Sequence, residues 1–132
     1  MKGNYGSWAN NAYGIRSVLS SGDYRFFATD SNGEQSRVNI SFQTGKVNYI
    51  VGVVDFDEGL ITSYLNGEKL FSNPLITNHI KKTSDSIFVG EAYGHNSLLK
   101  GNIYSTRVYN RALTPEEIAH NYAIEKERFG IE

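Results

Sequence analysis

The sequence predicts an all-β fold, an antiparallel β-sandwich or jelly roll, followed by one short C-terminal α-helix. Apolar and polar residues alternate along several short runs, which is typical of strands with one buried and one wet face. Turn residues separate these runs at intervals, as they do in sandwiches and jelly rolls. A strong helix start signal follows the last run, just after residue 113. We expect the 132 residues (1–132) to form a single domain.

The first two predicted strands form a half-buried pair. Strand Ser36–Gln43 carries its apolar residues on one face, at Val38, Ile40 and Phe42. Strand Asp23–Thr29 alternates in the same way. Between them, Asp30–Glu34 supplies Asp, Asn and Gly, which cap a turn and accept a positive φ.

The next strands surround a tight hairpin. Val47–Phe56 is apolar on both faces, so we expect it to be central in a sheet, and Asp55–Gly59 then turns the chain. Within Ile61–Phe71, Asn66-Gly67 lies between two strand-like runs. Both residues accept the positive φ of a two-residue type I′ turn, which predicts a β-hairpin.

The C-terminal part combines strands with the helix. After an irregular stretch at Ser72–Ser84, we predict strands at Ser86–Gly90 and Gly101–Asn110, joined by a loop at Glu91–Lys100.

For the helix, Thr114 is a natural N-cap, Pro115 fits the first helical position and Glu117 completes a capping box. Leu113 and Ile118 are spaced to form a hydrophobic staple before and after the cap. We expect Ile118, Tyr122 and the aliphatic stem of Glu125 to line one face, and Gly130 to end the helix.

Composition excludes several classes of protein. The absence of Cys excludes a disulfide framework, a thiolate metal site and a cysteine nucleophile. The formal net charge is −1 and the 13 Lys and Arg residues are scattered, which disfavours nucleic acid as a partner. No apolar run approaches the ~20 residues of a membrane helix, so we expect no membrane insertion. The N-terminus lacks a signal-peptide pattern, which predicts either another export route or excision from a longer chain.

Four segments in order resemble the C-terminal portion of laminin-G-like jelly-roll domains in the concanavalin A-like lectin/glucanase superfamily. They are Tyr49–Gly59, Tyr64-Leu-Asn-Gly67, the Ile-Phe-Val-Gly run at 87–90, and the ending Gly101–Ile118. The ending matches the family pattern G-x-I-x-x-x-R-[IV]-Y-x-R-x-L-[ST]-x-x-E-[IL] at many spaced positions. It departs at Tyr104-Ser105, where the family usually has an acidic pair.

The resemblance also implies further N-terminal strands, and residues 1–22 are too few to supply them all. We therefore expect a shortened jelly roll, or one completed by strands of a partner chain or of a longer parent chain. Open sheet edges are a hazard for a monomer, so we expect oligomerisation or residues outside this chain to cover them.

Catalysis is not predicted. Glucanases of this fold need two carboxylates that face each other, typically in a Glu-x-Asp-x-x-Glu arrangement, and no predicted strand carries one. Asp55 and Asp57 have i, i+2 spacing but fall in a turn. No Gly-x-Ser-x-Gly motif occurs, and His79, His95 and His120 lack metal-ligand spacing. A glycoside hydrolase is therefore the least favoured interpretation.

Calcium is a cofactor that the resemblance implies. Candidate oxygen ligands share one turn at Asp30, Asn32 and Glu34, and a second acidic group lies at Asp55, Asp57 and Glu58. Each group supplies fewer than the ~6–8 oxygens of a calcium site. Because turn chemistry explains both groups without a metal, we predict no cofactor, with calcium as the alternative.

A glycan or cell-surface polysaccharide is the predicted partner. A lectin site combines an aromatic ring with planar polar groups, and the loop residues Tyr93, His95 and Asn96 supply both. Trp8 and Tyr13, in an Asn- and Gly-rich stretch, are candidates for a second aromatic surface. The resemblance favours an extracellular or virion location, in a secreted bacterial or phage protein. The alternative is a structural or oligomerisation module of a phage tail or surface assembly without a soluble ligand.

Overall fold

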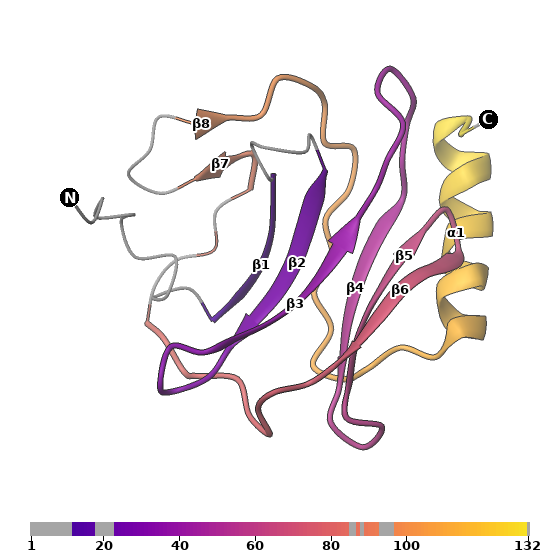
Figure 1. Ribbon diagram of the computed structural model, residues 1–132. Helices are drawn as coiled ribbons and strands as arrows, with labels where there is room; N and C mark the ends of the chain where they lie inside the picture. Colours follow the sequence, from indigo (N-terminus) through magenta and orange to yellow (C-terminus); the bar gives the residue numbers. More distant parts are fainter. Residues whose placement is uncertain (1–11, 18–22, 85–86, 88, 93–96, 132) are drawn as a thin grey trace.

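A computed structural model describes residues 12–17, 23–84, 87, 89–92 and 97–131 (Figure 1). Within these ranges, the strands form two three-stranded antiparallel sheets and a small two-stranded sheet. A helix follows them at the C-terminal end of the chain. The predicted all-β sandwich with one C-terminal helix is confirmed.

Sheet A has the strand order β1-β2-β3, with β1 at Tyr13–Ser17, β2 at Tyr24–Thr29 and β3 at Gln35–Ile40. The latter two strands confirm the predicted pair 23–29 and 36–43, with slightly shorter bounds. β1 was not predicted, because its short sequence Tyr-Gly-Ile-Arg-Ser shows no clear alternation.

Sheet B has the strand order β4-β5-β6, with β4 at Ile50–Asp55, β5 at Leu60–Leu65 and β6 at Glu68–Pro74. The predicted β5–β6 hairpin is confirmed, since Asn66 and Gly67 have φ values of 52° and 84°. Asn66 also ties the turn to the start of β4. Its backbone N–H donates to the carbonyl oxygen of Tyr49 at 2.8 Å, and its Oδ1 accepts from the Tyr49 N–H at 2.9 Å.

The main core lies between the two sheets. Its buried residues are Phe26, Ala28, Val38, Ile40 and Ile61. Strand β3 lies against β5 and β6, and side-chain hydrogen bonds cross this boundary. Ser63 Oγ donates to the Asn39 carbonyl oxygen, and Asn73 Nδ2 donates to the Arg37 carbonyl oxygen, both at 2.7 Å. The first of these bonds satisfies the fully buried Ser63 hydroxyl between two apolar layers.

A second core lies on the other face of sheet B, beneath helix α1 (Pro115–Phe129). Its buried residues are Val53, Tyr64, Leu113 and Ile118. The helix therefore covers sheet B opposite sheet A, which gives the domain three layers (Figure 1).

The helix ends confirm the sequence prediction in detail. Thr114 and Glu117 form the capping box, with each side chain accepting from the other residue's backbone N–H. Gly130 closes the helix in the left-handed conformation, and its N–H donates to the Lys126 carbonyl oxygen. Arg111 makes a bidentate ion pair with Glu117, at 2.8 and 2.7 Å. This pairing, with the bond from the Thr114 N–H, lowers the pKa of Glu117 to about 2.

The expectation that strand 47–56 is central in a sheet is wrong. Among the described strands, β4 lies at the edge of sheet B and β5 is in the middle. The sequence is apolar on both faces for another reason. Ile50 and Val54 pack on the main core, whereas Val51 and Val53 belong to the core under the helix. Sheet B is covered on both faces, and this coverage, not a central position within the sheet, explains why the strand is apolar on both faces.

Predictions for residues 86–110 are also corrected. The described residues of 86–90 form no strand, and the segment predicted as a loop at 91–100 contains β7 (Glu91–Ala92) and β8 (Ser97–Leu98), which pair with each other. Residues 101–110, predicted as a long strand, make no strand ladder with the described residues, and all are exposed. A strand needs a neighbour to bond its backbone, and the described part of the chain supplies none here.

The close approach of the sheets leads to the first prediction. A Cβ at Gly52, on β4, would clash with the ring of Phe26 in β2, whereas at Gly101 no atom lies within 4 Å of such a Cβ. We expect Gly52→Ala to lower the free energy of unfolding by about 1–3 kcal/mol, because the core is overpacked. Gly101→Ala is the matched control, and urea denaturation is the measurement. Equal stability of the two variants would contradict the packing that we describe.

Candidate functional site

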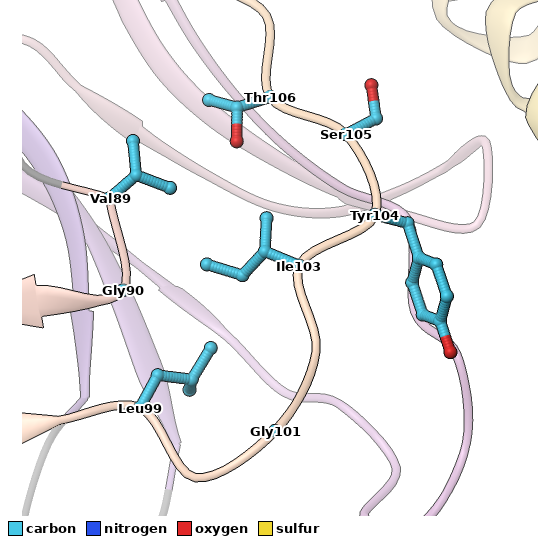
Figure 2. A pocket seen from close by; sticks show the side chains of 8 residues that line it. All are labelled: Val89, Gly90, Leu99, Gly101, Ile103, Tyr104, Ser105 and Thr106. Carbon is cyan, nitrogen blue, oxygen red and sulfur yellow. The ribbon is translucent and has the colours of Figure 1, made fainter.

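An open groove of about 510 Å³ lies beside the β7–β8 hairpin (Figure 2). Its lining residues come from both sides of that hairpin and are Val89, Gly90, Leu99, Gly101, Ile103, Tyr104, Ser105 and Thr106. Figure 2 shows the side chains of Val89, Leu99 and Ile103 directed toward a common space. The hairpin is joined at this point by a hydrogen bond from the Leu99 N–H to the Gly90 carbonyl oxygen, at 2.8 Å. The groove therefore has an apolar floor built from three aliphatic side chains.

Polar and aromatic groups lie along one side of this groove. Tyr104 is 56% exposed, and its ring directs away from Ile103 in Figure 2. The ring lies 5.4 Å from that of Phe129 on α1, at an interplanar angle of 42°. The hydroxyl groups of Ser105 and Thr106 follow in the chain. Tyr104 and Ser105 occupy the two positions where the sequence departs from the family's usual acidic pair, so a phenol and a hydroxyl stand there in place of carboxylates.

The predicted sugar-binding residues are only partly described. Tyr93, His95, Asn96 and Trp8 lie outside the described residues. Strands β7 and β8 flank the loop that carries the first three of these residues. The two strands are continuous with groove residues Gly90 and Leu99, so the predicted loop and the groove are neighbours in the chain. Tyr13 is the first residue of β1, opposite Ala28 in β2, and is 42% exposed.

Both acidic groups are organised as turns. Asp30 is buried, and its Oδ1 accepts from the backbone N–H groups of Asn32 and Glu34, at 2.8 and 2.9 Å. Asp55 Oδ1 accepts in the same way from Asp57 and Glu58, both at 3.0 Å. Among the described residues, no three His, Asp or Glu side chains are grouped so that they could hold a metal ion. Calcium binding at Asp30, Asn32 and Glu34 stays the alternative to the prediction of no cofactor.

Two ion pairs attach the segment after the groove to helix α1. Arg111 pairs with Glu117 at the surface, as described above. Arg107, 40% exposed, pairs with Glu125, which is only 2% exposed, and the hydrogen bond between them raises the pKa of Arg107. Its role is positioning, because it holds a buried carboxylate on the helix.

Tyrosines surround the buried pair. The Tyr49 and Tyr122 rings lie 5.9 Å apart, beside the hairpin turn at Gly67. Burial, followed by the nearby Tyr109 hydroxyl, raises the pKa of Tyr49. Both effects keep the phenol protonated, so this cluster contributes packing rather than an ionisable base.

The groove residues themselves were not predicted as a site. Tyr104, Ser105 and Thr106 lie within the predicted strand 101–110, and no sequence signal marks the groove apart from the departure from the acidic pair. Its apolar floor depends on Val89 and Ile103, which are 14 positions apart in the sequence. Only tertiary structure brings them together.

The layered sheets and terminal helix define the chain as a concanavalin A-like β-sandwich. The chain belongs to the laminin G family described as "Concanavalin A-like lectin/glucanases superfamily", whose family model matches residues 2–119.

A solved structure has a similar fold. It is a crystal structure of an S-layer domain-containing protein from Clostridium thermocellum ATCC 27405, with a TM-score of 0.51 and 21% sequence identity. The match covers 86% of this chain and 57% of that chain, so the present chain spans little more than half of the solved one. At this identity the similarity supports the fold alone. No curated protein sequence matches this chain at the significance that we required.

The two ion pairs lead to the second prediction. Arg107→Ala leaves the buried Glu125 carboxylate without its cation, so we expect a loss of about 2–3 kcal/mol in the free energy of unfolding, less than for a fully buried pair because water partly screens Arg107. Arg111→Ala, which breaks a surface pair, is the control and should cost much less. The double variant Arg107→Ala/Glu125→Leu should recover stability relative to Arg107→Ala. Failure of that rescue would argue against a buried ion pair.

The acidic turns lead to the third prediction. Because one carboxylate oxygen of each turn already bonds two backbone N–H groups, we expect the thermal midpoint to stay the same in EDTA and in added calcium chloride. Differential scanning fluorimetry measures this directly. A calcium-dependent rise that disappears in Asn32→Ala/Glu34→Ala would instead establish the alternative, a calcium site at the first turn.

Proposed function

We propose that this chain is a non-catalytic carbohydrate-binding or surface-recognition module of an extracellular or virion protein, and that the groove beside the β7–β8 hairpin receives the glycan. The observation that carries the proposal is an apolar groove with the side chains of Val89, Leu99 and Ile103 directed into it, beside which lie two hydroxyl groups and the exposed ring of Tyr104. Small-molecule sites typically combine an apolar surface with a few polar groups that set orientation.

Each part of the groove suits one part of a sugar. The apolar face of a pyranose ring packs on apolar or aromatic surfaces, which the aliphatic side chains of the groove offer. The Tyr104 ring, which directs away from Ile103 and packs on Phe129, offers an aromatic surface at the outer side of the groove. The Ser105 and Thr106 hydroxyls both donate and accept hydrogen bonds, as do sugar hydroxyls. In this proposal the predicted loop residues Tyr93, His95 and Asn96 extend the same site.

The composition of the groove supports binding without hydrolysis. Among the described residues that line it, none is Asp, Glu or His. Hydrolysis of a glycosidic bond needs two carboxyl groups across the substrate, one acting as acid and the other as base or nucleophile. The carboxylates of Asp30, Asp55 and Glu117 are engaged in turns and the helix cap instead. Membership in a family of lectins and glucanases, together with a fold like that of an S-layer domain-containing protein, also supports a surface module.

A second candidate function is structural, as an oligomerisation or assembly module. Residues 101–110 are exposed without a strand partner among the described residues, and they include the large apolar side chains Ile103 and Val108. Ile15 on β1 is also 41% exposed, although its paired neighbour Phe26 is in the core. An added strand from a second copy or from a longer parent chain would cover such a surface.

The fourth prediction tests the groove. On a glycan array and by calorimetry, we expect specific binding that Tyr104→Ala weakens at least about tenfold, since stacking and burial of one aromatic ring contribute at that scale. Phe71→Ala is the control, because Phe71 is a similarly exposed ring (47%) on β6, away from the groove lining. Tyr93→Ala tests the predicted loop separately. A blank array together with a defined trimer or larger oligomer in light scattering would favour the structural candidate.

A further inference from the structure

Residues 101–110 have the composition of a strand but no strand partner among the described residues. All ten are exposed, and no backbone hydrogen bond joins any of them to the part of the chain that the structure describes. Figure 1 shows the segment drawn out between the β7–β8 hairpin and α1. Its backbone N–H and C=O groups are therefore free to pair with a strand of another chain.

Four large apolar side chains stand on this segment. Ile103, Tyr104, Val108 and Tyr109 are each between 45% and 60% exposed. Figure 2 shows the neighbours Ile103 and Tyr104 pointing apart, as side chains alternate along a strand. On this alternation Ile103 and Tyr109 share one face, and Tyr104 and Val108 share the other. A partner strand must therefore offer apolar side chains on both of its faces.

The segment itself meets this requirement in one register. When two identical antiparallel strands are related by a twofold axis, the residue on the axis lies opposite its own copy. With Thr106 on the axis, Ile103 lies opposite Tyr109 of the second copy, and Tyr104 lies opposite Val108. Pairs of an aromatic with a β-branched residue, and Thr–Thr pairs, are among those that stabilise antiparallel sheets.

Neighbouring registers do not match in this way. With Ser105 on the axis, Ile103 lies opposite Arg107 of the second copy. With Arg107 on the axis, two guanidinium groups face each other, which destabilises a sheet. In the Thr106 register Arg107 lies opposite Ser105, and its charge is already balanced by Glu125 of its own copy. Of the three registers, the one at Thr106 is self-complementary in both shape and charge.

The segment is also held in place before it pairs. The ion pairs of Arg107 with Glu125 and of Arg111 with Glu117 attach its C-terminal half to α1. A segment that is already positioned loses less conformational freedom when it associates, so more of the pairing free energy remains for binding.

We propose that the partner of residues 101–110 is a second copy of this chain, and that the two copies form an antiparallel strand pair across a twofold axis at Thr106. The inference rests on the second candidate function, an oligomerisation module, and it names the partner and the register. Each copy satisfies the backbone groups that the other leaves unpaired.

Single cysteines test the register directly, because the chain contains no Cys of its own. Thr106→Cys places each thiol opposite its own copy, where the Cβ atoms lie about 5 Å apart. We expect a disulfide-linked dimer on a non-reducing gel after mild oxidation. The matched control is Asn102→Cys, whose two copies lie roughly 27 Å apart in this register and should not cross-link. An equimolar mixture of Asn102→Cys and Asn110→Cys chains should cross-link, since these positions lie opposite each other.

Sedimentation equilibrium of the whole chain measures the association itself. We expect a mass twice that of one chain. Val108→Asp should raise the dimer dissociation constant at least about tenfold, because each substitution alters two symmetry-related pairs. The control Phe71→Asp changes a similarly exposed apolar residue on β6 and should raise it less than about threefold. An unchanged circular dichroism spectrum of Val108→Asp separates lost pairing from lost folding.

The outcomes separate this inference from the functions proposed above. A monomer at all concentrations would overturn both the inference and the second candidate function as an oligomerisation module. A trimer or larger assembly would overturn the inference alone, as would equal weakening by Val108→Asp and Phe71→Asp. Cross-linking of Asn102→Cys as fast as Thr106→Cys would also overturn it. Val108 does not line the groove, so glycan binding is scored separately on the array.

Discussion

Exclusion of water from both faces of sheet B is the constraint on which this domain depends. Ile61 of β5 is fully buried against sheet A, and Tyr64 of the same strand is buried under the helix. Both covering layers, sheet A and the helix, are needed. Removing either would expose a row of apolar side chains to water, which costs about 25 cal/mol for each Å² of apolar surface exposed. The β5–β6 turn helps hold the layers in register, since Asn66 bonds Tyr49 twice and Gly67 lies against Tyr122.

The helix in turn determines the course of the segment before it. Leu113 is buried at the helix start, and the ion pairs of Arg107 and Arg111 attach residues 101–113 to α1 at two points. Between these attachments and the β7–β8 hairpin, residues 101–106 run exposed and form one wall of the groove. The groove is thus a consequence of how the helix is anchored. Its stability should follow that of the Arg107–Glu125 pair.

A nearly neutral protein can still have strongly charged regions. The 13 basic and 14 acidic residues almost cancel in number, yet three arginines share one face of sheet A while acidic side chains are used in turns and at the helix.

Short sequence signals were sufficient to predict the elements whose conformation depends on interactions between residues close together in the chain. The capping box at Thr114 and Glu117, the left-handed Gly130 and the Asn66-Gly67 turn were all predicted, because each uses hydrogen bonds or φ values set within a few residues. Alternation likewise identified β2 and β3, since a period of two reports which face is buried. These elements made the all-β class and the family predictable.

Features that depend on distant neighbours were not predictable in this way. Apolar residues on both faces of β4 indicate that both faces are packed against other layers, but they do not indicate whether the strand has neighbours on one side or on both sides within its sheet. Residues 101–110 have the composition of a strand, yet a strand forms only where another backbone bonds to it. Arg16, Arg25 and Arg37 look scattered along the chain because only the strand register places them together. Pairing and packing between segments therefore decided the groove and the grouping of these arginines, whereas short-range hydrogen bonding and hydrophobic periodicity had already specified the elements that carry them.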